Sequence, residues 1–241
     1  MINKIKTYWQ KISGNFFGNY SRDIGIDLGT SKVAAVVVTM DANGLFHVIG
    51  GGMANSEGGI KQGYINDMDK AVAALKAAKE EAMTQADVKK VEGVCVSVDS
   101  IHFKGENLRD SVTINSKDQI ITDEDIERVL DQAKNNCKMA QQESVLHRIP
   151  QIYHIQGQRE VRNPLNMVGA SLEAEVRLIL APSSVLNNIR RVAQLAGFPK
   201  AELVYSPLAT AEAILPRQDK DNSAVVIDIG EDLTHVGIFH L

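Results

Sequence analysis

The feature that most constrains the fold is a strand–turn–strand pattern that occurs twice. The first copy is DIGIDLGTSKVAAVVV, residues 23–38, and the second is VVIDIGEDLTHVGIF, residues 225–239. In each copy an apolar run reaches Asp-x-Gly, turns and resumes, which predicts a hairpin of two buried strands. Glycine in such a turn lets the backbone approach phosphate oxygens, and successive N–H groups form an anion-binding concavity. The repeat therefore predicts two phosphate-binding turns that meet at one cleft.

The first turn carries residue types that suit a nucleotide phosphate. Asp27 is expected to hold magnesium through water, because magnesium gives up its hydration shell reluctantly. Gly29, Thr30 and Ser31 would supply backbone and hydroxyl donors, and Lys32 a positive charge for the terminal phosphate. The same short pattern also occurs in hairpins that bind nothing, so the prediction depends on the second copy.

The second turn has different chemistry. Asp228 and Gly230 keep the pattern and are predicted to form the opposite wall, but Glu231 and Asp232 follow the glycine. Two like unit charges about 4 Å apart repel by about 4 kcal/mol at an effective dielectric constant near 20. These acids therefore predict weakened phosphate binding. The alternative is that they point outward, toward magnesium or solvent.

Composition excludes several classes of protein. The chain has 241 residues and a formal net charge of -4, which argues against a general nucleic-acid binder. Its two cysteines, Cys95 and Cys137, form no C-x-x-C motif, so a disulfide framework is not expected and a reducing cytosol fits best. No apolar run approaches the roughly 20 residues that span a bilayer, and no secretory signal is visible.

The first twenty residues differ from the rest because they contain lysine but no acid. Their large apolar side chains recur at spacings of three and four, which places them on one face of a helix. Such a face with flanking lysines suits the headgroup region of an anionic membrane. The alternative is a helix docked on its own domain. The residues predicted to contact the membrane are Ile2, Lys4, Ile5, Lys6, Trp9, Lys11, Ile12 and Phe16.

Between the two hairpins the pattern alternates strands and helices. Residues 55–67 are glycine-rich and predicted as a loop, and residues 100–181 predict a small sheet crossed by one helix with Thr122 as its N-cap. Helices are predicted over residues 68–86, 120–137, 183–198 and 207–215. Strands are predicted over residues 23–29, 32–40, 44–53, 91–100, 111–114, 145–155, 172–180 and 201–206.

Several stretches resemble the FtsA family of bacterial cell-division proteins, a branch of the actin-like ATPases. The two hairpins are similar to the first and second phosphate motifs of these ATPases, and residues 58–78 and 205–215 also match. Residues 143–180 resemble the inserted subdomain that distinguishes the family. The residues that carry this part of the resemblance are His147, Ile149, Pro150, Tyr153, Asn163, Pro164, Met167, Gly169 and Leu172.

The resemblance implies an α/β fold: the first half of an actin-like ATPase (ribonuclease H-like) with an inserted small α+β subdomain, truncated in the second half. Residues 1–20 would form the basic amphipathic segment and tether, and residues 94–181 the inserted subdomain 1C. Subdomain 1A would comprise residues 21–93 and 182–216. Residues 217–241 would be the first hairpin of subdomain 2A, whose remainder, including the adenine pocket and the FtsZ-tail groove, is absent.

The family's function follows as an expectation. Such proteins tie filaments of the tubulin-like FtsZ to the inner face of the cell membrane, polymerise, and recruit later division proteins through the inserted subdomain. They bind ATP and magnesium, here with weak or no ATPase activity expected. In the family a C-terminal amphipathic helix reaches the membrane; residues 1–20 of this chain have the same chemistry.

The sequence also departs from the family pattern in the second hairpin. Leu233 and His235 stand where the second motif normally has threonine and aspartate. Together with Glu231 and Asp232, they put ATP binding by this chain in question.

Two other functions stay open. One alternative is a scaffold for type IV pilus assembly similar to PilM, and the other is an ATP-dependent enzyme of the sugar-kinase type, whose catalytic base would lie in the missing half.

Overall fold

The computed structural model describes residues 22–41, 45–156, 160–216 and 223–239. They form two compact units. The inserted unit is Phe103–Ala181, and the discontinuous unit combines residues 22–102 with residues 182–239. The predicted membrane-contacting residues, from Ile2 to Phe16, lie outside the described part of the chain.

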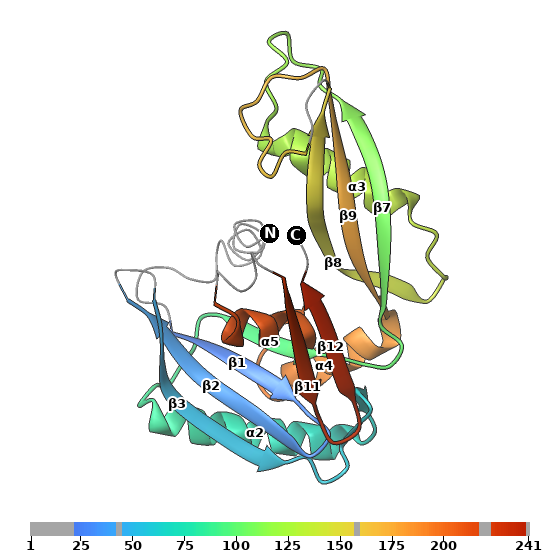
Figure 1. The fold of residues 1–241 in the computed structure, drawn as a ribbon. Helices are drawn as coiled ribbons and strands as arrows, with labels where there is room; N and C mark the ends of the chain where they lie inside the picture. The colour runs from blue at the N-terminus through green and yellow to red at the C-terminus, as the bar shows by residue number, and fades with distance from the viewer. Residues whose placement is uncertain (1–21, 42–44, 157–159, 217–222, 240–241) are drawn as a thin grey trace. The chain divides into compact units, whose positions relative to one another are not determined.

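A five-stranded sheet organises the discontinuous unit, in the order β10-β6-β1-β2-β3 (Figure 1). Strands β1 to β3 are consecutive and antiparallel, whereas β6 and β10 run parallel to β1. The carboxyl ends of these three parallel strands therefore meet at one edge, where ligands bind in many open α/β sheets. The strands are β1 (Arg22–Leu28), β2 (Lys32–Met40), β3 (Phe46–Asn55), β6 (Val94–Val98) and β10 (Glu202–Tyr205).

The position of β6 corrects one predicted boundary. Residue 94 was expected to begin the inserted subdomain, but β6 pairs with β1 from Ile24 opposite Val94 to Asp27 opposite Ser97. The inserted unit begins only at Phe103. The apolar alternation of β6 fits this central place, because Val94, Val96 and Val98 are all buried.

Helix α2 (Met68–Gln85) packs unusually closely on β2 and β3 (Figure 1). Asp67 caps its first turn by accepting a hydrogen bond from the Lys70 N–H at 3.1 Å. Its buried face consists mainly of alanine, and it meets glycines of β3. A Cβ atom built on Gly50 would lie 2.2 Å from the Ala82 carbonyl oxygen, and one on Gly52 would lie 2.2 Å from that of Ala78. Only glycine permits this approach of helix to strand.

Residues 55–67 do not form the plain loop that their composition predicted. Two very short strands, β4 (Ile60–Lys61) and β5 (Tyr64–Ile65), pair as an antiparallel hairpin. Gln62 and Gly63, between them, have φ values of 51° and 78°. Positive φ at both central residues is the signature of a type I′ turn, which matches the natural twist of paired strands.

The remaining elements of the discontinuous unit are two helices and a separate hairpin. Helices α4 (Ser183–Leu195) and α5 (Ser206–Ile214) flank β10 in the chain, and the hairpin consists of β11 (Ala224–Ile229) and β12 (Thr234–Phe239). Among the described strands, β11 and β12 pair only with each other. The hairpin packs against α5, and it buries Val226 and Phe239.

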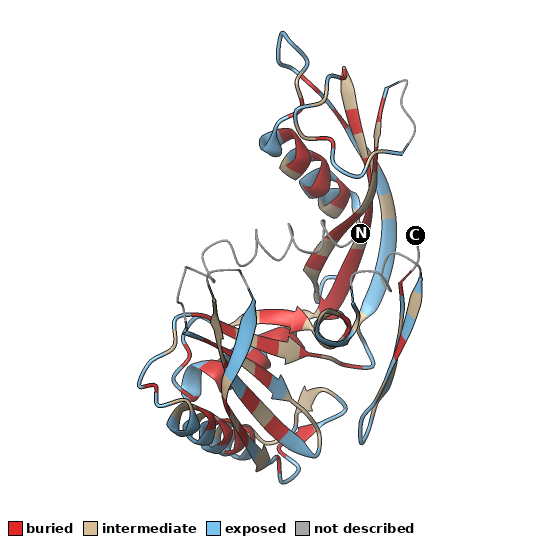
Figure 2. Cartoon of the chain, turned by 60° about the vertical axis from the view of Figure 1, so that its left-hand side comes forward, coloured by how far each residue is buried: buried red, intermediate tan, exposed pale blue. Residues whose placement is uncertain are grey.

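One face of the hairpin is left exposed and apolar (Figure 2). We call this set the exposed hairpin face. Its side chains are between 59% and 78% accessible to solvent: Val225, Ile227, Ile229, Val236 and Ile238.

The inserted unit is a three-stranded sheet with one helix, in the order β7-β9-β8. Its elements are β7 (Lys104–Thr113), α3 (Asp123–Asn136), β8 (Glu143–Ile155) and β9 (Ser171–Pro182). Figure 2 shows the side of α3 that faces the sheet as buried, and this side contains Ile126, Val129, Leu130 and Ala133. The predicted cap is confirmed, because Thr122 and Asp125 form a reciprocal capping box.

Strand β7 is longer than its sequence suggested. The pattern predicted a strand only from residue 111, whereas the structure begins it at Lys104. The added segment is polar, and it is held by antiparallel pairing with β9 from Lys104 opposite Leu180 onward.

None of the described helices is long and apolar enough to cross a membrane.

Candidate functional site

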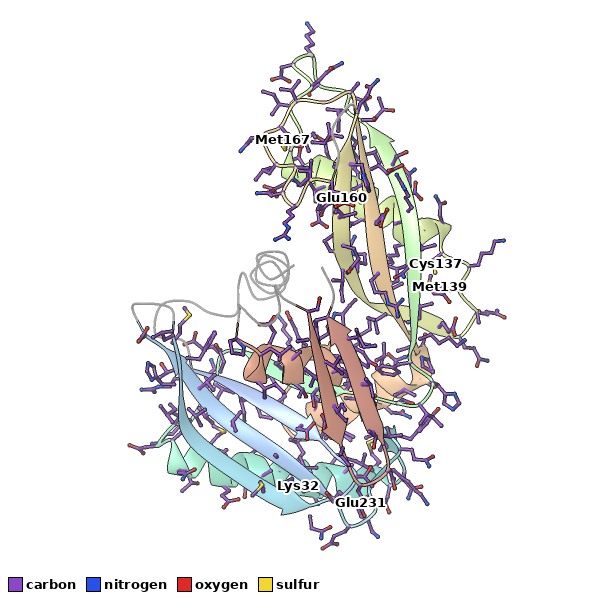
Figure 3. The ribbon with its side chains drawn as sticks, in the orientation of Figure 1. Lys32, Cys137, Met139, Glu160, Met167 and Glu231 are labelled. Carbon is purple, nitrogen blue, oxygen red and sulfur yellow. The ribbon has the colours of Figure 1, made fainter. Side chains whose placement is uncertain are left out.

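The two predicted turns are built in the same way. The Gly29 N–H donates to the Lys32 carbonyl at 3.0 Å, and the Gly230 N–H donates to the Leu233 carbonyl at 2.9 Å. A Cβ atom on either glycine would approach that same carbonyl oxygen, at 2.8 Å in the first turn and 3.0 Å in the second. The sequence repeat is therefore a structural repeat of one tight glycine turn. Figure 3 labels Lys32 and Glu231, at the end of the unit where these turns lie.

Both turns line a single cavity of about 470 Å³ in the discontinuous unit. Asp27, Gly29 and Thr30 contribute from the first turn, and Asp228 and Gly230 from the second. The convergence of two Asp-x-Gly turns, which the sequence predicted, is thus present. Two predicted contacts of the first turn, Ser31 and Lys32, are not among the described lining residues.

Each aspartate is held by a hydroxyl group from a neighbouring element. Asp27 accepts a hydrogen bond from the Ser97 Oγ at the end of β6, and Asp228 lies 3.3 Å from the Thr210 Oγ1 on α5. Sequence reasoning missed both hydroxyl partners. For Ser97 a signal was available, since a strand parallel to β1 must end at the same edge as Asp27.

The first turn is supported from behind by Ser56, which is 1% exposed. The Ser56 Oγ donates to the Thr30 carbonyl, and the Ser56 N–H donates to the Ser31 carbonyl at 3.1 Å. Both carbonyl groups of the turn are therefore satisfied within the protein. This fixes the turn before any ligand is present, which reduces the entropy lost on binding.

The charge of the cavity is strongly negative. Five carboxylates line it: Asp27, Asp99, Asp228, Glu231 and Asp232. No lysine or arginine is found among its described lining residues. A phosphate group without a cation would be repelled here, whereas a phosphate that carries magnesium would bring its own positive charge.

Asp99 is a partly buried acid of this set and was not predicted. Burial raises the pKa of its carboxyl group, and the charges of Asp228 and Asp27 raise it further. His235 and the Ser100 N–H act in the opposite direction and lower the pKa of the same group. His235 contacts Asp99 through Nε2, so the side chain at the position where the family pattern has aspartate pairs with an acid of the cavity.

The two acids after Gly230 differ in their surroundings. The Asp232 Oδ2 accepts a hydrogen bond from the Gln62 N–H at 3.1 Å, in the turn between β4 and β5. Glu231 is exposed at the tip of the turn (Figure 3). Asp232 is thus held by a backbone N–H of the protein, and both acids are exposed and keep their charge near the turn.

The residues present fit a magnesium-bound phosphate better than a bare one. The glycine turns offer close backbone approach, and Asp27 and Asp228 offer the oxygen ligands that magnesium prefers. Within the described part of the chain no group of three or more His, Cys, Asp or Glu side chains is arranged to hold a metal by itself. Any cation would therefore need ligand or water oxygens as well.

Comparison with known proteins identifies relatives for both units. Residues 100–180 match the family model described as the SHS2 domain inserted in FtsA. The cell-division protein FtsA of Borreliella burgdorferi is 31% identical over 218 residues, which are 90% of this chain and 52% of that protein. FtsA of Enterococcus hirae is 33% identical over 217 residues, 90% of this chain and 48% of that protein. The chain spans about half the length of the curated relatives it matches.

Among solved structures, the PilM–PilN type IV pilus biogenesis complex is similar to this chain with a TM-score of 0.60. The match covers 90% of this chain and 57% of that one, at 16% identity, so it bears on the fold alone. The predicted fold class, an actin-like ATPase fold with the inserted FtsA-type domain, is confirmed.

Proposed function

Because this chain is a relative of the bacterial cell-division protein FtsA, we propose that it acts as an actin-like assembly factor in cell division. The observation that carries the proposal is the match of residues 100–180 to the SHS2 domain inserted in FtsA. Proteins that are 31–33% identical to this chain over nine-tenths of its length are named FtsA in several bacteria, which further supports the proposal. Its role would be assembly and recruitment, with partners that include FtsZ and later division proteins.

The cavity between the two glycine turns is the proposed nucleotide site. ATP would bind as its magnesium complex, with Asp27 and Asp228 near the cation and the turns of Gly29 and Gly230 near the phosphates. The five lining carboxylates support weak binding and little or no ATP hydrolysis. When bound, magnesium would supply charge neutralisation of the phosphates.

Removing one exposed acid of the second turn should strengthen nucleotide binding. Glu231→Gln is expected to tighten Mg-ATP binding about three- to tenfold, because one like charge is lost near the phosphates and solvent screens part of its effect. Isothermal titration of the full chain with Mg-ATP measures this. A sub-micromolar dissociation constant for the unmodified chain would contradict the proposed weak site.

Glu80→Gln is the matched control for this charge effect. Glu80 is an exposed glutamate of α2 and is not among the described residues that line the cavity. It should leave Mg-ATP affinity unchanged. If Glu231→Gln and Glu80→Gln bind Mg-ATP equally, the second turn does not face the phosphates as proposed.

The chain is also proposed to work at the cytoplasmic face of the cell membrane. Support comes from the composition of residues 1–20, with lysines and large apolar side chains but no acids. Anionic headgroups would attract the lysines, while the apolar side chains would enter the headgroup region. Self-association into filaments is a further expectation from the family.

Localisation in dividing bacteria tests the proposed function. The full chain, fused to a fluorescent protein, should gather at midcell and should disperse when FtsZ is depleted. The variant lacking residues 1–18 should leave the membrane fraction. Enrichment at the cell poles, as expected of a pilus factor, or a midcell signal that survives FtsZ depletion would contradict a division role.

A further inference from the structure

The second turn belongs to a hairpin with little backbone attachment to the rest of its unit. Among the described strands, β11 and β12 pair only with each other, so no ladder of hydrogen bonds ties them to the five-stranded sheet. What holds the hairpin is packing on α5 and a small number of side-chain contacts. The position of the second turn, which forms one wall of the cavity, therefore depends on those contacts.

One of these contacts joins β12 directly to the end of β6. The His235 Nε2 is shielded from solvent and lies against the Asp99 Oδ2. Both side chains are 18% exposed. The other carboxylate oxygen of Asp99 accepts the Ser100 N–H at 2.6 Å, so this carboxylate is fixed by its own chain while it meets the hairpin.

A second contact lies beside the first. The turn between β4 and β5 approaches the same place: a Cβ atom on Gly63 would lie 1.9 Å from the Asp99 carbonyl oxygen. Its neighbour Gln62 donates its N–H to Asp232 of the hairpin at 3.1 Å. Three segments distant in the chain thus meet around Asp99, and the hairpin contributes Asp232 and His235.

We propose that His235 and Asp99 form a latch that fixes the second phosphate turn against the sheet, with the Asp232–Gln62 contact as its companion. In this assignment His235 is a positioning residue of the cavity and does not bind the ligand. Asp27 and Asp228 also face Asp99, so His235 is the one described lining side chain able to offset the charge of this acid. The part of the inference that concerns nucleotide affinity rests on the proposed function.

The latch predicts that loss of the His235 side chain loosens the hairpin. His235→Ala leaves Asp99 enclosed beside two other acids, and an unpaired charge of this kind is costly. Amide hydrogen exchange in β11 and β12 should then accelerate about tenfold or more, because the hairpin opens locally more often. Adding Asp99→Asn to His235→Ala removes the stranded charge and should restore part of the protection, because the pairing itself is still absent.

His47→Ala is the matched control. His47 pairs with Asp41 at 3.0 Å, with the same two residue types as the latch, but it lies at the exposed start of β3 with 55% of its side chain accessible. Exchange in β11 and β12 should be the same in this variant as in the unmodified chain. Equal exchange in His235→Ala and His47→Ala would overturn the latch, as would an Asp99→Asn substitution that adds to the effect of His235→Ala.

Titration with Mg-ATP separates the latch from the proposed function. If the unmodified chain binds Mg-ATP, His235→Ala should weaken binding about tenfold, and the double variant should recover part of that loss. If the unmodified chain binds no Mg-ATP, the proposed nucleotide site fails. The exchange experiment then still decides whether the latch exists, since it needs no ligand.

Discussion

Substituting Gly50 or Gly52 with alanine should destabilise the discontinuous unit by about 3 kcal/mol or more. In either case the new methyl group would lie 2.2 Å from a backbone carbonyl oxygen of α2. Backbone atoms cannot rotate away as a long side chain does, so α2 would have to move off the sheet. Its buried alanines and Leu75 would then lose their contacts with β3. Thermal denaturation followed by circular dichroism measures the loss.

Gly51 provides the internal control for this prediction. It lies between the two critical glycines, yet a Cβ atom there would be 3.7 Å from the Gln85 Oε1, an ordinary contact with a side chain. Gly51→Ala should therefore unfold within a few degrees of the unmodified chain. If Gly51→Ala is as unstable as Gly50→Ala, the glycines of β3 are needed for backbone flexibility and not for the close approach of α2.

Acidification should destabilise the inserted unit through His147, by about 3 kcal/mol in total. His147 is 2% exposed, and burial lowers its pKa from 6.5 to about 4. The folded chain keeps this imidazole neutral, while the unfolded chain binds a proton as the pH falls below about 6.5. Stability is thus complete above that pH, declines as the pH falls toward about 4, and loses nothing more from this group below it.

Urea denaturation at a series of pH values between 7 and 4 measures this loss. His147→Gln has no titrating group at this position, so its unfolding midpoint should lose most of its dependence on pH in that window. His154→Gln is the control in the same strand. His154 is a partly exposed residue, 3.4 Å from Glu175, and its replacement should keep the acid sensitivity. An unchanged pH profile in His147→Gln would rule out His147 as the cause.

The sequence predicted the parts of the site that a local pattern determines. Asp27 and Asp228 were identified because each ends an apolar strand before a glycine turn, and such turns look alike wherever they occur. The same reasoning placed Thr122 at the start of α3, since a cap depends on residues only three positions apart. The family resemblance supplied the rest of the architecture.

What the sequence did not predict depends on contacts between distant segments. Thr210 carries no local signal, and the signal for Ser97 lies in the pairing of β6 with β1. Both hydroxyl groups reach the aspartates only because β6 and α5 lie beside the two turns. Strand β7 was cut short in the prediction because its first half is polar and is ordered by pairing with β9. The strands β4 and β5 are too short to show any alternation.

Lys32 is a predicted phosphate contact that is not among the described residues lining the cavity. Its place after the turn suggested a contact with the terminal phosphate, but it is already the first residue of β2 and is exposed. Sequence spacing gives the distance of a residue from a turn along the chain and does not give the direction of its side chain. Whether Lys32 approaches a bound ligand remains a prediction.

The exposed hairpin face has a practical consequence for anyone who purifies this chain. Five β-branched side chains in contact with water each favour transfer to an apolar environment by about 1 kcal/mol or more. The two strands that carry them also have unpaired outer edges within the described structure, which are templates for further pairing. Concentrated samples should therefore aggregate before dilute ones, and charged substitutions at Ile229 or Ile238 are the changes to make for solubility.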